Sequence, residues 1–236
     1  MDAAGNAKGF AVAAFDTVKA RADRVLIVAS GKSATDLDLG LVRDARQAGV
    51  YILAVNRAWD WCEDIDGWFT LDPNYLVIKY MAPGYKHAAR FVAIPDDYGQ
   101  PDARIRYHRN KERAPSICYL QRISGDGPLK SCYELATDRS KIHTGNSAYG
   151  ALGLAKHMKA ERVALIGVDA NRRAGYAYHE GRTLTFLSHL PLLFQSAVPQ
   201  LVDDGIQVIN GSPNSRVTCF PRCSPNRAVE WVMEGL

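Results

Sequence analysis

The chain contains no apolar run that reaches the ~18 residues of a membrane-spanning helix. Near its start it also lacks a basic segment followed by the apolar stretch of a secretion signal. Cysteine is scarce: the sequence holds five, an odd number without a paired framework of disulfides. Together these absences predict a protein of the reducing cytoplasm.

Metal-ligand spacing is sparse as well. Cys219 and Cys223 are separated by three residues, a spacing at which two thiolates can bind one metal ion. No second Cys or His pair with ligand spacing lies near them in the sequence. We therefore predict no metal site from this pair.

Both familiar phosphate-binding signatures are missing too. Gly31-Lys32-Ser33 imitates the end of a P-loop, but the earlier glycine that such a loop requires is replaced by Leu26, inside a predicted strand. The dinucleotide signature G-x-G-x-x-G is absent, since the same turn has a single glycine. A Walker-type ATPase and an ordinary dinucleotide enzyme are therefore not expected.

What the sequence does contain is the composition of a soluble α/β protein. It has 236 residues, of which 47% are hydrophobic and 23% charged, enough to bury the core of one domain. The net charge of +4 suits an anionic ligand. Basic residues cluster over 104–113, where a solvated loop is favoured over contact with phosphate, a sugar acid or nucleic acid.

Helix and strand patterns alternate along the chain. Short β-branched runs predict buried parallel strands, and runs with apolar residues at helical spacing predict the helices between them. The predicted strands cover 24–29, 50–55, 68–73, 90–95, 116–122, 162–169 and 206–210, and the predicted helices cover 8–22, 36–48, 147–159, 183–204 and 225–234. This order predicts a Rossmann-like, doubly wound α/β fold with a mainly parallel sheet and helices on both faces. We expect a single domain over 1–236, with an insertion or lid at about 96–140, where the pattern weakens.

Ligands of such a sheet bind beyond the carboxyl ends of its strands, so polar residues at those ends are candidate contacts. They offer hydroxyls, a cation, an amide, a carboxylate and a glycine that permits close approach. The candidates that follow the first three strands are Ser30, Gly31, Lys32, Ser33, Asn56 and Asp72. A plain strand-to-helix turn is the alternative interpretation of the first group.

Two later turns carry polar residues as well. Thr144, Gly145 and Asn146 come directly before a predicted helix, whose free N–H groups suit a phosphate or carboxylate. An ordinary helix N-cap is the alternative there. Asp169 and Asn171 follow the clearest buried strand, and a capping role is likewise the alternative for Asp169.

The order of these features resembles a known group of enzymes. It comprises a strand with a Gly-x-Ser turn, a strand ending in Asn, a strand ending before Pro, Thr-Gly opening a helix, a strand ending in Gly-x-Asp, Tyr-Ala, a later His, and Ser-Pro-Asn-Ser. This order resembles the bacterial lipooligosaccharide sialyltransferases. It is also similar to their wider relatives, the motility-accessory-factor glycosyltransferases and the archaeal-type hydroxymethylpterin diphosphokinases. The resemblance covers about 24–75 and 138–225 and leaves 76–137 unmatched.

The resemblance implies a binding site for an activated donor at the first three strand ends. Gly31 and Ser33 would lie under the donor nucleotide. Asn56 and Asp72 would contact its base, ribose or phosphate region.

The resemblance also implies the reacting groups. Thr144 and Gly145 would follow the donor phosphate, and Asp169 would approach its cytidine-like end. Tyr176 matches a tyrosine that stabilises the departing phosphate, and His189 matches the general base. An imidazole near its unperturbed pKa can remove a proton from an acceptor hydroxyl at neutral pH, although a packed structural histidine is the alternative.

The sequence departs from the pattern of the sialyltransferases at three places. The turn that usually reads Gly-Asn-Gly-Pro-Ser is Ala-Ser-Gly-Lys-Ser at 29–33, Asn171 replaces a tyrosine, and the arginine before Thr-Gly is nearest to Lys141. The cations Lys32 and 172–173 would suit a more heavily charged donor, such as a nucleoside diphosphate sugar or a triphosphate.

Three functions are therefore carried forward. The first is a glycosyltransferase that uses a nucleotide-sugar donor and a hydroxyl-bearing acceptor, with no essential cofactor. The second is a diphosphokinase that uses ATP, with Mg²⁺ held by Asp72 and Asp169. The third is a non-catalytic nucleotide-binding module, in which the basic segment 104–113 contacts nucleic acid or another protein. The sequence gives no basis for naming the acceptor or an oligomeric state.

Overall fold

The computed structural model describes residues 15–71, 88–95, 117–171 and 185–236. Within them, eight strands form one sheet in the order β6-β5-β4-β3-β2-β1-β7-β8, and each neighbouring pair is parallel. This arrangement, with helices on both faces, confirms the predicted Rossmann-like α/β fold. All strands finish on the same side, which we call the carboxyl edge; the opposite side is the amino edge.

Most helices and strands fall close to the predicted ranges. The strands are β1 (Arg24–Val28), β2 (Tyr51–Val55), β3 (Gly67–Thr70), β4 (Ala89–Pro95), β5 (Ile117–Ile123), β6 (Lys141–His143), β7 (Arg162–Ile166) and β8 (Gln207–Asn210). The α-helices are α1 (Leu39–Gln47), α4 (Ser147–His157), α5 (Leu190–Asp203) and α6 (Pro225–Met233), and the 3₁₀ helices are η1 (Lys32–Asp36), η2 (Asn56–Asp60), η3 (Pro128–Lys130) and η4 (Thr185–His189). None of the helices described is both long and apolar enough to cross a membrane.

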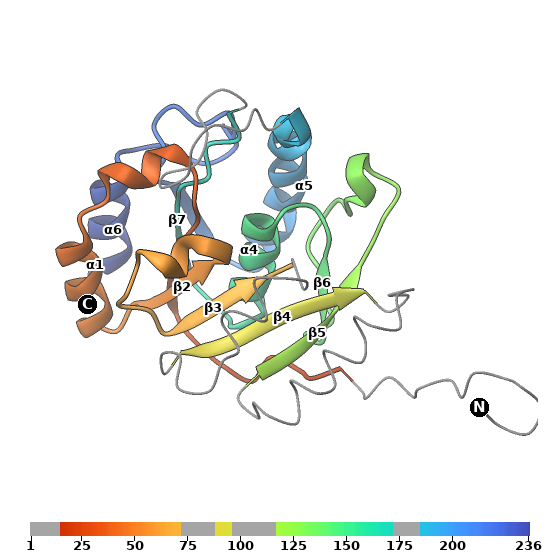
Figure 1. Cartoon of the computed structure of the whole chain (residues 1–236), viewed down its shortest axis with the longest axis horizontal. Helices are drawn as coiled ribbons and strands as arrows, with labels where there is room; N and C mark the ends of the chain where they lie inside the picture. The colour runs from red at the N-terminus through yellow and green to blue at the C-terminus, as the bar shows by residue number, and fades with distance from the viewer. Residues whose placement is uncertain (1–14, 72–87, 96–116, 172–184) are drawn as a thin grey trace, which may run out of the picture.

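The sheet lies between two layers of helices. Val25 and Ile27 of β1 belong to the core that α4 and α5 cover, whereas Leu26 and Val28 belong to the core that α1 and α6 cover. Figure 1 shows α1 and α6 together on one side of the sheet and α4 and α5 on the other. Because both faces of the central strands are buried, these strands are apolar throughout rather than alternating, as the sequence indicated.

The predicted helix over 8–22 is wrong for 15–22; residues 1–14 lie outside the described part. Residues 15–22 are extended, and Val18 is fully buried, with Ala20 and Ala22 packed against the same core. Backbone N–H groups of this segment donate to carbonyls of distant segments rather than within a helix, as in the 3.1 Å bond from Val18 to the carbonyl of Arg139. The buried positions therefore recur at every second residue, a strand-like period that the helical reading overlooked.

The region expected to be an insertion contributes directly to the sheet. Its residues 117–123 form β5, which pairs with β4 and β6, while 96–116 lie outside the described residues. β6 was not predicted, because three residues are too short to show a period. The prediction of one domain with a lid thus stays a prediction.

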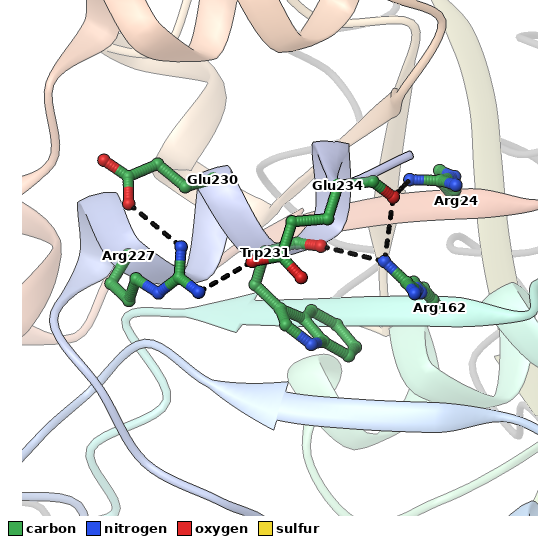
Figure 2. A network of polar contacts seen from close by, with 6 residues as sticks. All are labelled: Arg24, Arg162, Arg227, Glu230, Trp231 and Glu234. Carbon is green, nitrogen blue, oxygen red and sulfur yellow. Dashed lines mark hydrogen bonds and ion pairs between the residues drawn. The ribbon is translucent and has the colours of Figure 1, made fainter. Parts of the chain in front are cut away.

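Two arginines hold the end of α6 at the amino edge. Arg24 begins β1 and Arg162 begins β7, and they are register partners across the sheet. Arg24 donates to the carbonyl oxygen of Glu234 across 2.6 Å, and Arg162 donates to the same oxygen across 3.0 Å (Figure 2). The Arg162 guanidinium also lies 5.4 Å from the ring centroid of Trp231. Both cations thus satisfy carbonyls at the negative end of the helix dipole, which offsets their mutual repulsion.

Candidate functional site

The chain reverses its direction across the sheet between β1 and β7. From β1 it proceeds strand by strand to β6, and α4 then returns it to β7, on the other side of β1. Loops that follow the two strands at such a point diverge, and ligands of open parallel sheets bind between them. The candidate site is therefore the carboxyl edge around β1 and β7.

Two backbones touch at this point. The N–H of Gly31 donates to the carbonyl oxygen of Gly167 across 2.9 Å. A Cβ added to Gly31 would lie 2.3 Å from the same oxygen, closer than atoms can pack. The glycine that we expected to admit a ligand thus admits the neighbouring turn, which explains its presence without a ligand.

Ser33 and Asp169 join the same two turns. The backbone N–H of Ser33 donates to Asp169 Oδ2 across 2.9 Å, and its hydroxyl donates to Oδ1. Because that hydroxyl has one proton, it accepts from Ser212 Oγ, which lies 2.7 Å away. Ser212 Oγ accepts in turn from the N–H of Val168 across 3.1 Å. The structure therefore brings Ser33 and Asp169 together, and the contacts of both residues with a donor stay predictions.

Asn56 lies in a second polar cluster, at the end of β2. Its Oδ1 accepts from Thr70 across 2.7 Å, and its Nδ2 donates to Ser147 Oγ across 3.0 Å. Its φ of +52° lies in the left-handed region, which asparagine tolerates better than most residues. Asn56 therefore braces the end of β2 against β3 and α4, with both ends of its side chain engaged.

The turn before α4 runs along the carboxyl edge. Thr144 donates its N–H to Ile123 of β5 across 2.7 Å, whereas Ser147 contacts Asn56 at the end of β2. The four residues 144–147 thus pass from β5 to β2 across the ends of the strands between them. This path places the predicted Thr144 and Asn56 on one edge of the sheet.

Asn146 caps the helix at the end of this turn. Its Oδ1 accepts from the N–H groups of Ala148 (2.8 Å) and Tyr149 (3.4 Å), so the ordinary N-cap alternative is realised. Gly145 leaves room for Leu193 of α5 to pack against the turn, because a Cβ there would lie 2.1 Å from Leu193 Cδ2. Within the described residues the Asn146 Nδ2 group makes no hydrogen bond, and it is therefore a donor still available to a ligand.

His189 stands at the junction of η4 and α5 and is 9% exposed. Its Nε2 is buried and has no hydrogen-bond partner among the residues that the structure describes. Residues four apart on a helix share a face, so His189 lies one turn from Leu193, which packs at Gly145. A buried polar atom without a partner is costly and rare in native proteins, and it requires an explanation.

The remaining predicted residues are less constrained. Ser30 Oγ at the end of β1 is buried without a hydrogen-bond partner, whereas Lys32 is exposed at the start of η1. Asn171 is half-buried just past Asp169. Tyr176 and Asp72 lie outside the described residues. The predicted roles of Tyr176 in catalysis and of Asp72 after β3 therefore stay predictions.

Two residues of this edge were missed as candidates. Ser212 is fully buried in the hydrogen-bond chain, and its one sequence signal was the Ser-Pro-Asn-Ser segment. Arg122, near the end of β5, donates from Nε to the Thr144 hydroxyl across 3.0 Å. No local pattern marks Arg122, because the turn that it contacts belongs to another strand.

Metal ligands do not gather in the described part of the chain. No group of three or more His, Cys, Asp or Glu side chains there is placed to hold a metal ion. All five cysteines are free thiols. Burial raises the pKa of Cys219 to about 11, so its thiol stays protonated at neutral pH.

The sheet order and the two helix layers define a protein of the Rossmann-like α/β class. No family model matches the sequence, and no curated protein matches it either. A solved structure, the MAf glycosyltransferase from Magnetospirillum magneticum AMB-1, is similar with a TM-score of 0.53 and 12% identity. The similarity covers 93% of this chain but 38% of that chain, so the present chain spans well under half of its length. At this identity the comparison shows a shared fold.

Proposed function

We propose that this protein is a glycosyltransferase, which moves a sugar from a nucleotide-activated donor to an acceptor hydroxyl. The observation that carries the proposal is the buried, unpartnered Nε2 of His189, one helical turn from the residue that packs on Gly145. An imidazole nitrogen without a hydrogen-bond partner in the described residues has no internal donor that competes for it, so in the tautomer with a free lone pair on Nε2 it can accept a proton. The fold shared with a protein named a glycosyltransferase and the sequence resemblance support the same reaction.

The proposed chemistry is a single displacement. Nε2 of His189 removes the proton of the acceptor hydroxyl while its oxygen attacks the anomeric carbon of the donor sugar. The bond from that carbon to the phosphate oxygen breaks, and the nucleotide leaves with the electron pair. Lys32 and Tyr176 would stabilise the negative charge that develops on the phosphate. The imidazolium then returns its proton to water.

The diphosphokinase alternative is less well supported. It requires Asp169 to hold Mg²⁺, and both carboxylate oxygens of Asp169 already accept hydrogen bonds from Ser33. Asp169 keeps lone pairs that could reach a metal, but no group of three or more His, Cys, Asp or Glu side chains in the described residues is placed to hold one. The glycosyltransferase proposed here does not depend on such a group.

The donor class is part of the proposal. A sialyltransferase-like donor, an acidic sugar linked to a cytidine monophosphate, is suggested by the sequence resemblance. Lys32, exposed just after β1 at the carboxyl edge, also suits a nucleoside diphosphate sugar, which carries one more phosphate. Both donors leave a nucleotide phosphate at the same edge, and they differ in base and charge.

The test is a panel of ligands with and without metal. A ligand that binds the folded state alone raises the unfolding temperature by mass action. We expect stabilisation by cytidine or uridine nucleotides and their sugars, and release of nucleotide from the matching sugar donor in the presence of EDTA. Stabilisation by ATP with an absolute need for Mg²⁺ would support the diphosphokinase instead. Binding of nucleotides without turnover of any donor would support the non-catalytic module.

A further inference from the structure

The guanidinium of Arg122 is fixed at the carboxyl edge by two parts of the chain. Its Nε donates to Thr144 Oγ1 across 3.0 Å, and its Nη1 donates to the carbonyl oxygen of Leu71, just past β3, also across 3.0 Å. Arg122 is half-buried, and Thr144 is 2% exposed. The two bonds therefore hold the planar group in one orientation.

The positive charge of Arg122 has no acidic partner in the described part of the chain. Arg43 and Arg46 do have acidic partners: Arg43 pairs with Asp64 at 3.1 Å, and Arg46 pairs with Asp66 at 2.8 Å. Within the described residues, Arg122 uses two of its five guanidinium N–H groups, and both bonds go to neutral oxygens. A held cation without a counter-ion favours binding of an anion, and its unused N–H groups match the two oxygens of a phosphoryl or carboxylate group.

The surroundings of Arg122 agree with such a ligand. Arg122 contacts Thr144, the first residue of the turn 144–147. This turn leads into the N-terminus of α4, which is the positive end of the helix dipole. Asn146, in the same turn, still has an available Nδ2 donor. Lys141, to which the sequence comparison assigned the cation of this turn, instead pairs with Asp138 at 3.2 Å.

We infer that Arg122 binds an oxyanion of the substrate, either a nucleotide phosphate or a sugar carboxylate, at the carboxyl edge. The identity of that substrate rests on the proposed function; the binding of an anion does not. The inference thus deepens the donor site by adding a residue that neither motif nor family resemblance supplied.

The test measures binding of two simple anions, inorganic pyrophosphate and glucuronate, together with the nucleotides that stabilise the protein. Hydrogen bonds to a charged group contribute about 1.5–3 kcal/mol, which corresponds to a loss of roughly 10- to 100-fold in affinity for Arg122→Gln. Arg122→Lys keeps the charge but loses the planar pair of donors, so an intermediate loss is expected. The control Arg43→Gln removes an equal charge far from the edge and should change affinity less than about twofold.

The outcomes separate the two ligand sources and the two proposals. A loss confined to pyrophosphate and nucleotides assigns a phosphate to Arg122, and a loss confined to glucuronate assigns a carboxylate. If the Arg122 variant binds anions weakly but the wild type transfers no sugar, the anion site at Arg122 is supported and the glycosyltransferase proposal is rejected. The inference is overturned if the wild type binds neither anion. It is equally overturned if Arg122→Gln or Arg122→Lys, with a thermal midpoint near that of the wild type, binds both anions normally.

Discussion

The two edges of the sheet use their arginines differently: Arg24 and Arg162 end a helix at the amino edge, whereas Arg122 at the carboxyl edge holds a turn. At the amino edge, Arg24 and Arg162 cap the carbonyls that end α6. At the carboxyl edge, the hydroxyl of Ser30 and the Nε2 of His189 are buried without partners, and Arg122 has no counter-ion in the described ranges. Buried polar atoms without a hydrogen-bond partner occur at the amino edge too, at Tyr51 Oη and Arg139, so this cost alone does not mark a binding site. The carboxyl edge differs in its position, because ligands of open parallel sheets bind there, where the chain reverses its direction.

The largest effect that this comparison predicts is loss of catalysis at the carboxyl edge. His189→Gln should lower kcat by roughly 10²- to 10⁴-fold, because general-base catalysis contributes about that much. Donor affinity, measured by titration, should change little. His157→Gln at the amino edge is the matched control and should retain kcat. Normal turnover by His189→Gln would remove this residue from the mechanism.

The next effect concerns the contact between the turns at the carboxyl edge. Gly31→Ala places a Cβ 2.3 Å from the Gly167 carbonyl oxygen, and it should destabilise the protein by about 1–3 kcal/mol or more. Gly153→Ala on α4 is the control, because its nearest neighbour would lie 3.7 Å away. The control should stabilise the helix by about 0.5–1 kcal/mol, as alanine favours helices. Urea denaturation measures both, and equal effects would contradict the close packing.

A third prediction reverses the comparison at the amino edge. The double variant Arg24→Met with Arg162→Met should lower stability by about 1–2 kcal/mol, since the α6 carbonyls lose their donors. Turnover at a temperature where the variant is folded should not change. Arg43→Met, which breaks an exposed ion pair, should fall within about 0.5 kcal/mol of the wild type. Loss of turnover in the folded double variant would show that the two edges are coupled.

The amino edge should also have its own pH dependence. Burial lowers the pKa of His157 below its ordinary value of 6.5, despite the hydrogen bond from its Nε2 to the Lys141 carbonyl. Lys156 and Arg139 lower it further, and Asp138 opposes them. Because the unfolded chain then takes up a proton more readily, stability should be full above about pH 7 and fall as the pH decreases through 6.5. Unfolding curves of His157→Gln should lack this part of the pH dependence.

The smallest effect compares two residues with positive φ. Lys159 follows α4 at the amino edge with φ of +67°, is exposed, and makes no side-chain contact in the described residues. Lys159→Gly should stabilise the protein by up to about 1 kcal/mol, because glycine adopts this conformation without strain. Asn56→Gly, with φ of +52°, should instead destabilise it, since the bonds to Thr70 and Ser147 are lost. Thermal denaturation distinguishes the two signs.

The central strands could be predicted because strands buried on both faces consist almost entirely of apolar residues. The run at 162–166 is apolar at nearly every position, which indicates a strand covered on both faces. The segment 15–22 could not be predicted in the same way, since its four apolar residues fit either period until their partners are known. Its partners, such as Tyr119 and Arg139, are about one hundred residues away, and only the tertiary structure shows them.

The site divides along the same line. Polar residues after strands were expected to share one edge, and Ser33 and Asp169 do meet there. The sequence could not show that the Asn56 side chain bonds to Ser147, or that the Asn146 side chain caps α4. Arg122 could not be recognised as a candidate either. What singles it out is the lack of an acidic partner in the described residues, which no sequence pattern shows.

The position of β1 within the sheet also sets when the carboxyl edge can be completed during synthesis. Strands β2 to β6 can join β1 as they leave the ribosome, but β7, its other neighbour, is made after all of them. The bond between Ser33 and Asp169 spans 136 residues, and Ser212 follows later still. A nascent chain that stops before β8 therefore possesses most of the sheet and the bond between Ser33 and Asp169, but it lacks Ser212. The hydrogen-bond chain at the centre of the carboxyl edge would be completed in one step, when the segment after β8 is made, rather than grow with chain length.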